Sequence, residues 1–306
     1  YVKYYIPFST KLFLFILLWT FLPVQIFSQD KFTIDQVMSS GFPSNLTTAS
    51  SGDFAAWVTN KKGVRNIYVS GGSLASTKMV TSYTLDDGQV ISNLIFSSDN
   101  KDLFYVKGGA PNRKGEIPNP LSLPEKTKRE IWKINLKNNS VTLVSEGHSP
   151  SLSHQGKLLV FINKGQVWQV DLTSGEKPKQ LFSIRGRVGT LTWSPDDSKL
   201  AFQSNRSDHS YIGIYQLVTK SINYIAPSVD YDSNPVWAPD SKRIAFIRTP
   251  REAENLPFLV KRSAIPWRIY IGDTKNDHAT EIWRASEGMG SAFRFISAAN
   301  QLFWTD

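Results

Sequence analysis

The chain has 306 residues, 41% of them hydrophobic, and no cysteine, which excludes disulfide bonds, thiolate zinc sites and lipid attachment through a cysteine. Lys and Arg number 35 against 26 Asp and Glu, which gives a formal charge of +9. These positive charges are scattered along predicted turns rather than gathered in a stripe, so we expect a solvated basic surface and no nucleic-acid partner.

The first 29 residues have the pattern of an export signal. Lys3 and Lys11 precede a mainly apolar run, residues 12–22, which Pro23 ends. A basic start, a short apolar run and a polar exit at residues 28–30 are typical of a secretory signal peptide, and the run is short for a membrane span. We therefore predict a signal peptide over residues 1–29 and a periplasmic or extracellular protein. The alternative is that this segment remains uncleaved as an N-terminal anchor, which would be the only membrane contact that we expect.

A phrase of ten residues then recurs along the chain. It reads WSPDDSKLAF from Trp193 and WAPDSKRIAF from Trp237, with weaker copies from Thr48, Phe96, Leu152 and Phe295. In every copy an apolar triplet begins seven residues after the first position, and successive copies lie 41 to 58 residues apart. A repeat of this length with short predicted strands is typical of a β-propeller, which we predict over residues 30–306 with blades starting near 48, 96, 152, 193, 237 and 295.

Two further strands complete each predicted unit. The third strand contains an aliphatic residue followed by an aromatic one, as in Ile131-Trp132 and Ile214-Tyr215. A fourth strand follows it, for example near Leu143. The predicted fold is therefore all-β: a propeller of four-stranded blades, five units and the start of a sixth, from an incomplete seven- or eight-bladed disc. We interpret the Trp and Tyr side chains as packing between blades.

The repeats contain no recognisable catalytic constellation. Residues 147–151 (GHSPS) approach the G-x-S-x-G nucleophile motif, but the second glycine is missing and a proline is present, so we interpret the match as chance. The four histidines lie on separate turns, without metal-ligand spacing. The paired acids Asp196 and Asp197 belong to a turn. We expect no catalytic residue, no metal and no cofactor in this chain.

Two insertions interrupt the repeat between a second and a third strand. They span residues 107–129 and 249–266, and this shared position predicts that both emerge on one face of the disc. Long loops on a rigid scaffold often bind ligands, although they can also cover an edge or dock a neighbouring domain. The candidate substrate-contact residues are polar or charged: Asn112, Arg113, Glu116, Asn119, Arg251, Glu252 and Glu254.

Several stretches carry a resemblance to a known family. They are FTIDQV at residues 32–37, GVRNIYV at 63–69, the GG…PNP insertion at 108–120 and PWRIY at 266–270. Over residues 30–306 the chain resembles the N-terminal propeller of secreted bacterial peptidases of the prolyl oligopeptidase family, of the dipeptidyl-peptidase and acylaminoacyl-peptidase kind. The turn phrase alone is also found in TolB-type propellers.

The resemblance implies a division of labour within a longer polypeptide. An α/β-hydrolase domain downstream would supply Ser, Asp and His, and the propeller would admit only peptide substrates. Dipeptidyl-peptidase members hold the substrate amino terminus with paired glutamates, but the sequence around Glu252 and Glu254 does not match that motif. The alternative is a TolB-like periplasmic interaction propeller without activity. The first predicted blade follows the signal segment closely, and this favours the peptidase.

Overall fold

The computed structural model describes residues 32–50, 52–71, 77–251, 267–276, 278–285 and 302–305. The chain divides into two units, residues 1–40 and 41–306. In the first, helix α2 (Ile34–Met38) begins at a capping box, in which Thr33 and Gln36 exchange hydrogen bonds of 2.9 and 3.1 Å. The predicted signal peptide, residues 1–29, lies outside the described residues. In the described part of the chain, no helix is long and apolar enough to span a membrane.

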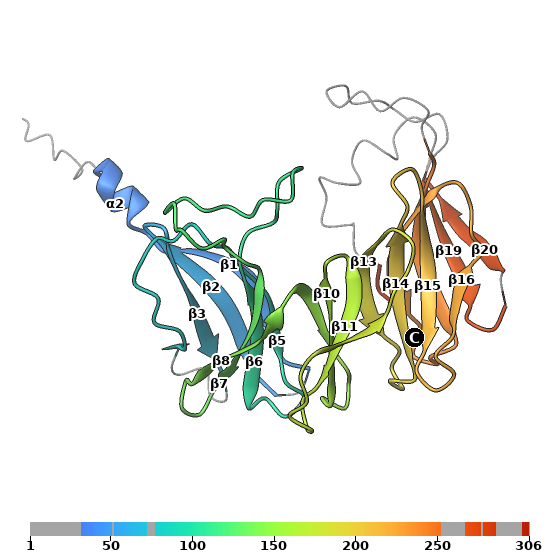
Figure 1. The fold of residues 1–306 in the computed structure, drawn as a ribbon, viewed down its shortest axis with the longest axis horizontal. Helices are drawn as coiled ribbons and strands as arrows, with labels where there is room; N and C mark the ends of the chain where they lie inside the picture. The colour runs from blue at the N-terminus through green and yellow to red at the C-terminus, as the bar shows by residue number, and fades with distance from the viewer. Residues whose placement is uncertain are drawn as a thin grey trace, which may run out of the picture. The chain divides into compact units, whose positions relative to one another are not determined.

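The second unit consists of antiparallel four-stranded sheets, which we call blades 1 to 5 (Figure 1). Blade 1 contains β1 (Phe42–Thr48), β2 (Ala55–Lys61), β3 (Val64–Ser70) and β4 (Lys78–Met79), and blade 2 contains β5 (Ile91–Phe96), β6 (Asp102–Lys107), β7 (Glu130–Asn135) and β8 (Val141–Glu146). Blade 3 contains β9 (His148–Leu152), β10 (Leu158–Asn163), β11 (Gln166–Asp171) and β12 (Lys179–Phe182). Blade 4 contains β13 (Arg187–Trp193), β14 (Lys199–Asn205), β15 (Ser210–Gln216) and β16 (Ile222–Ile225), and blade 5 contains β17 (Tyr231–Trp237), β18 (Arg243–Thr249), β19 (Arg268–Asp273) and β20 (Ala279–Arg284).

Successive blades touch through their first strands. Strand β1 lies against β5, β5 against β9, β9 against β13 and β13 against β17. Blades 4 and 5 also share one parallel bridge, between Ser210 and Tyr231. Neighbouring four-stranded meanders joined through their first strands are the architecture of a β-propeller, which confirms the predicted fold class. The predicted sixth unit, from Phe295, lies mostly outside the described residues, and the incomplete disc stays a prediction.

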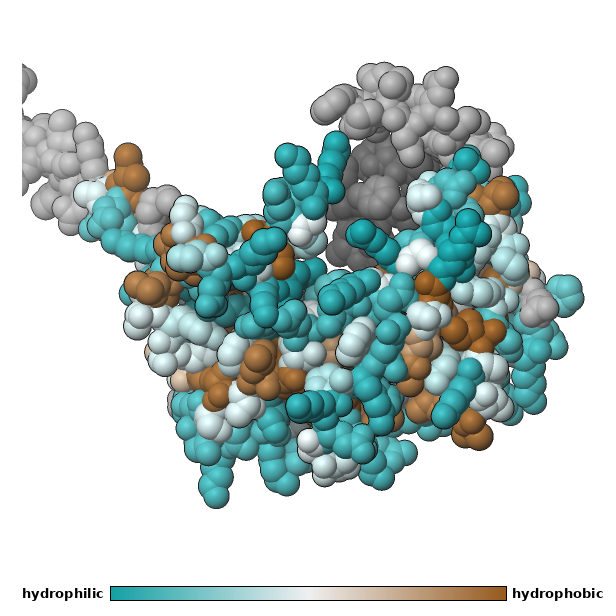
Figure 2. Space-filling model, in the orientation of Figure 1, coloured by the Kyte–Doolittle hydropathy of each residue, from teal (hydrophilic) through white to brown (hydrophobic). Residues whose placement is uncertain are grey.

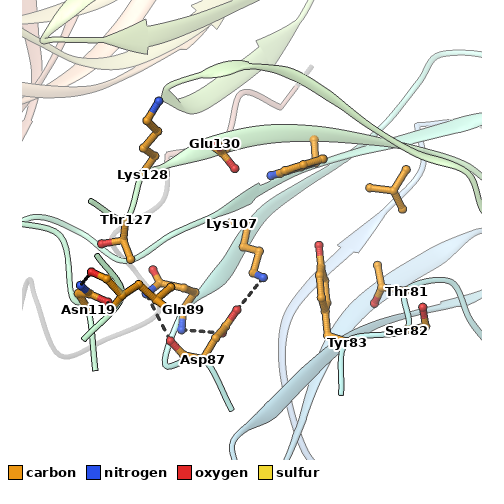
Figure 3. Close-up of a pocket in the computed structure, with 13 residues that line it drawn as sticks. Thr81, Ser82, Tyr83, Asp87, Gln89, Lys107, Asn119, Thr127, Lys128 and Glu130 are labelled. Atoms are coloured by element: carbon orange, nitrogen blue, oxygen red, sulfur yellow. Dashed lines mark hydrogen bonds and ion pairs between the residues drawn. The ribbon is translucent and has the colours of Figure 1, made fainter. Parts of the chain in front are cut away.

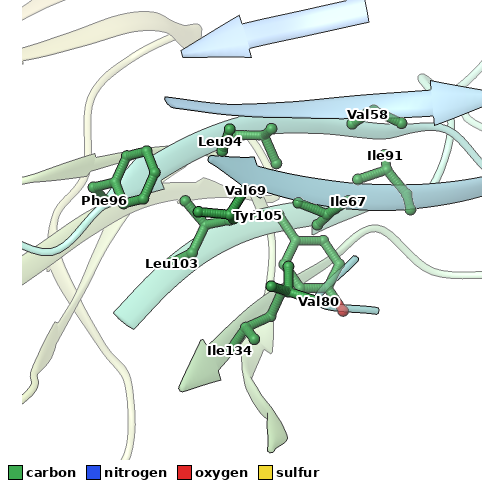
Figure 4. Packing of buried hydrophobic residues seen from close by; sticks show 11 residues of the cluster. Val58, Ile67, Val69, Val80, Ile91, Leu94, Phe96, Leu103, Tyr105 and Ile134 are labelled. Atoms are coloured by element: carbon green, nitrogen blue, oxygen red, sulfur yellow. The ribbon is translucent and has the colours of Figure 1, made fainter. Parts of the chain in front are cut away.

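The hydrophobic core lies between blades rather than within one sheet. Between blades 1 and 2, side chains from β2 and β3 meet side chains from β5 and β6, among them Ile67, Leu94 and Tyr105 (Figure 4). Equivalent clusters join blades 2 and 3, blades 3 and 4, and blades 4 and 5. In Figure 2, hydrophilic side chains dominate the upper and lower rims, and hydrophobic residues occur mainly between them. Burial between sheets therefore holds consecutive blades together.

The repeated phrase marks the turn from the first strand to the second. Its first residue is the last residue of β1, β5, β9, β13 and β17 in turn. The indole Nε1 of Trp193 donates a hydrogen bond of 3.1 Å to the Ser151 carbonyl of the preceding blade, and Trp237 donates one of 3.1 Å to Thr192. These tryptophans therefore pack between blades, as we interpreted them from the sequence, and the hydrogen bonds are an addition from the structure.

Candidate functional site

The direction of the strands assigns each connection to one of two faces. In an antiparallel meander, the links between second and third strands and the links between blades emerge together, and we call this side the loop face. The turns between first and second strands lie on the opposite side, the turn face. The end of β6 and the start of β7 lie on the loop face, as do the end of β18 and the start of β19, between which the two predicted insertions fall. Figure 1 draws the first of these insertions between its two labelled strands, as the green loop in the upper part of the view.

The described insertion between β6 and β7 is held by two asparagine side chains. The Oδ1 of Asn112 accepts hydrogen bonds from the backbone of Lys114 and Glu116, and its Nδ2 donates to the Glu116 carboxylate at 2.8 Å. Asn119 closes a second turn through the backbone N–H and carbonyl of Leu123. Asn112, Glu116 and Asn119 thus shape the loop, and Arg113 is exposed at its tip.

Beneath this loop lies a cavity of about 630 Å³, which we call the blade 1–2 pocket (Figure 3). Gln89 ties the loop down, because its Nε2 donates to the Pro118 carbonyl at 2.8 Å and its Oε1 accepts from the Gly109 N–H at 3.3 Å. The lining comes from the link between blades 1 and 2, the insertion and blade 2: Thr81, Ser82, Tyr83, Asp87, Gln89, Lys107, Asn119, Leu123, Thr127, Lys128, Glu130, Trp132 and Val141.

The polar groups of the pocket are concentrated around Lys107. Its Nζ lies 2.6 Å from the Asp87 carboxylate and 4.1 Å from the centre of the Tyr83 ring. Burial alone raises the pKa of Asp87, but the hydrogen bonds from Lys107 and the Gln89 N–H and the charge of Lys107 outweigh it, so the pKa lies below its ordinary value. The Tyr83 hydroxyl bonds the Tyr105 hydroxyl at 2.7 Å.

A hydrogen-bond donor in this lining is unused. The buried Nε1 of Trp132 has no hydrogen-bond partner among the residues that the structure describes, and such a group usually has one. The pocket therefore offers an ion pair and a phenol beside apolar surface, which includes the Trp132 side chain. This combination suits a ligand that carries amide groups and side chains of mixed polarity.

Arg251, from the second group of predicted site residues, does not line this pocket. The Arg251 backbone N–H donates to Asp230 at 3.1 Å, and its guanidinium lies 3.4 Å from the Asp208 carboxylate of blade 4. Glu252 and Glu254 lie outside the described residues. Of the seven candidates, the structure places Asn119 in the pocket lining.

Sequence reasoning missed Tyr83, Lys107 and Trp132. The Trp132 signal was present but was interpreted as packing, because aromatic residues recur at that strand position. Tyr83 and Lys107 come from separate segments, and only the tertiary structure brings them together.

The near-match to a nucleophile motif forms part of a strand. His148 Nδ1 lies 3.0 Å from Ser149 Oγ, both at the start of β9. Burial and the charge of Arg129 lower the pKa of His148 to about 4, so its imidazole is neutral at pH 7. In the described part of the chain no carboxylate hydrogen-bonds this histidine, and a triad needs such a third group. Nor do the described residues include three His, Cys, Asp or Glu side chains grouped to hold a metal.

No family model matches the chain. Dipeptidyl-peptidase 5 of Porphyromonas gingivalis (strain ATCC 33277) is 22% identical over 277 residues, which make up 85% of this chain. The chain spans 39% of the length of that relative.

Two solved structures are similar in fold. A puromycin-hydrolyzing peptidase of Mycobacterium tuberculosis matches with a TM-score of 0.57 at 10% identity, over 82% of this chain and 39% of that one. The β-propeller domain of the Trilobed protease from Pyrococcus furiosus matches with a TM-score of 0.50 at 16% identity, over 79% of this chain and 71% of that one. These findings confirm the resemblance drawn from the sequence: the chain is a β-propeller, similar in sequence to a dipeptidyl-peptidase and in fold to a peptidase propeller.

Proposed function

We propose that residues 30–306 form the substrate-selecting propeller of an exported serine peptidase, with the catalytic Ser, Asp and His on a hydrolase domain of the same polypeptide. The similarity to a dipeptidyl-peptidase over 85% of the chain is the observation that carries this proposal. The blade 1–2 pocket and its overhanging loop supply a surface that can discriminate between peptides. Hydrolysis would proceed through an acyl-enzyme formed elsewhere in the protein.

In this proposal, the propeller acts by binding and exclusion. Four inter-blade cores make a rigid scaffold, and the loop tied down by Gln89 projects from its rim. A peptide that reaches the pocket meets Lys107, Tyr83 and Trp132. Substrate preference would then depend on residues far from the reacting bond, through the part of the substrate that the pocket holds.

The test uses the whole protein carrying Lys107→Met. We expect the KM for short peptides to rise roughly 3- to 10-fold with kcat nearly unchanged. The substitution removes one of the two lysines of the pocket lining and leaves Asp87 without its lysine partner, a loss of about 1 kcal/mol of binding. Initial rates over a series of peptide concentrations measure both constants.

Lys101→Met is the matched control. Lys101 lies on the turn face and also forms an ion pair, with Asp99 at 3.0 Å, so its removal should leave KM unchanged. Equal effects of the two substitutions would contradict a selecting role for the pocket. A protein that hydrolyses no peptide would instead favour the TolB-like interaction propeller.

A further inference from the structure

The loop face carries a set of cations that have no acidic partner. Arg129 directly precedes strand β7, and Lys164 lies in the hairpin between β10 and β11. Arg185 lies in the link between blades 3 and 4, and Arg187 is the first residue of β13. None of the four forms an ion pair within the described residues. We call these four residues the cationic strip.

Five other cations of the loop face are each paired with an acid. Lys107 is paired with Asp87 at 2.6 Å, Arg251 with Asp208 at 3.4 Å, and Lys128 with Glu146. Arg65 lies 3.5 Å from Asp86, and Arg248 lies 2.7 Å from Asp232. Each of these five acids is therefore already engaged by a cation outside the strip.

Arg129 is the residue of the strip that has a buried hydrogen-bond donor without an acceptor among the described residues. Its guanidinium is half-buried, its Nε is buried without an acceptor, and burial lowers the pKa of the group. A Cβ on Gly108 would lie 2.8 Å from the Arg129 Cα and 3.1 Å from its Cγ, and Gly108 has a φ of 125°. Glycine at position 108 thus permits this close approach. A buried donor without an acceptor is rare, and a bound anion would satisfy it.

The four residues of the strip lie on the loop face at blade 3 and beside it. The charge of Arg129 acts on His148 at the start of β9. Arg187 packs on the neighbouring hairpin, where its Cγ lies 3.1 Å from the position of a Cβ on Gly165, next to Lys164. Lys164, Arg185 and Arg187 are exposed. A ligand lying on blade 3 would therefore meet positive charge at both ends.

We propose that the cationic strip binds the carboxylate groups of acidic peptides, with Arg129 as the central contact. The adjoining residue Lys128 lines the blade 1–2 pocket, so the strip extends the surface on which the proposed function places a peptide. Guanidinium groups bind carboxylates with two parallel hydrogen bonds, and this geometry gives Arg an advantage over Lys at such a contact. This inference rests on the proposed function and adds to it a substrate class, peptides rich in Asp and Glu.

The experiment measures binding of two labelled hexapeptides to the whole protein by fluorescence anisotropy at low temperature. One peptide contains two Glu and a free C-terminus; the other has Gln at both positions and a C-terminal amide. We expect the acidic peptide to bind about tenfold more tightly, because hydrogen bonds between charged groups are stronger than neutral ones. Mass spectrometry after each titration checks that the peptides are intact.

Two variants of equal charge locate the effect. The triple variant Lys164→Gln, Arg185→Gln and Arg187→Gln should lose most of the preference for the acidic peptide. The control Lys137→Gln, Lys177→Gln and Lys220→Gln removes three exposed lysines from the turn face and should keep it. Arg129→Gln should lower affinity for the acidic peptide about tenfold and leave the neutral peptide unaffected.

Equal affinity for the two peptides, or equal losses in the two triple variants, would overturn the inference. The inference would also be overturned if the strip triple variant kept its preference for the acidic peptide but showed weakened attachment of another domain. That result would identify a domain contact as the role of the strip. Hydrolysis of neutral peptides is scored separately. If the protein hydrolyses peptides but does not prefer acidic ones, this inference is refuted and the proposed function stands. If it binds acidic peptides but hydrolyses none, the proposed peptidase function is refuted and the binding inference stands.

Discussion

Replacing Arg248 with Met is expected to lower the free energy of unfolding by about 3–5 kcal/mol at neutral pH. Arg248 and Asp232 form a buried pair in blade 5, with hydrogen bonds of 2.7 and 2.8 Å from the guanidinium to the carboxylate. Asp232 is fully buried and Arg248 is 7% exposed. The variant would leave the carboxylate without its counter-ion in a site that water does not reach. Chemical denaturation at pH 7 measures the loss.

The size of this loss should depend on pH. Burial already raises the pKa of Asp232 to about 6 with Arg248 in place, and removal of the cation would raise it further. An acid whose folded pKa lies above its unfolded value stabilises the fold below the unfolded pKa, and this contribution disappears as the pH rises through the folded pKa. The penalty of Arg248→Met should therefore be larger at pH 8 than at pH 5.

Arg243→Met is the matched control on the same strand. Arg243 forms an exposed ion pair with Asp240 at 2.8 Å, and exposed pairs contribute about 0–1 kcal/mol. We expect a small loss with little dependence on pH over the same range. If Arg248→Met were as mild as Arg243→Met, the buried pair would not be a structural element of blade 5.

Trp193→Ala is expected to destabilise the propeller by about 3–5 kcal/mol. The side chain is 4% exposed and packs among residues of blades 3 and 4, and its Nε1 bonds the Ser151 carbonyl. The substitution removes a large part of the interface between two blades. Because each blade is stabilised mainly by its neighbours, we expect the loss to appear in the global unfolding transition.

Two further substitutions separate packing from hydrogen bonding. Trp193→Phe keeps an aromatic ring but removes the donor, and we expect a loss of about 1–3 kcal/mol. Trp283→Ala, on the outer strand β20, removes a side chain that is 46% exposed and should have a much smaller effect than Trp193→Ala. Equal effects of Trp193→Ala and Trp283→Ala would contradict the inter-blade role.

Much of the fold could be predicted from the repeated phrase. An aromatic or apolar residue, a polar turn and an apolar triplet define the first two strands of each blade, because the turn needs polar residues and the triplet is buried between sheets. The short strand β4 (Lys78–Met79) was not predicted, since two exposed residues give no periodic signal. The contact of Asp197 with His154, at 2.9 Å between neighbouring blades, also depends on tertiary structure.

Bulges in the first strands are a second feature that the alternation of polar and apolar residues did not predict. The register shifts within each of these strands, and Asn45, Asn93, Ser149 and Asn234 have φ between 51° and 53° there. Asn tolerates the left-handed region better than most residues, so its recurrence three positions before the phrase was an available signal.

The candidate site could be predicted only in part. The position of the insertion and the face it leaves from follow from the order of the strands. Its polar residues looked suited to a substrate, but Asn112 and Glu116 bond each other, and whether they also contact a substrate stays a prediction. In the pocket, Lys107 forms an ion pair with Asp87 and contacts the ring of Tyr83. A sequence pattern within one segment cannot predict such contacts, because the residues come from different segments.

Peptide hydrolysis should be measured for two preparations, the purified chain and the whole protein that its gene encodes. We expect no turnover of peptide esters by the chain alone. The whole protein should hydrolyse peptides and lose this activity when the serine of a G-x-S-x-G motif outside residues 1–306 is replaced by Ala. Turnover by the chain alone that survives removal of contaminating peptidases, or a whole protein without peptidase activity, would contradict the account.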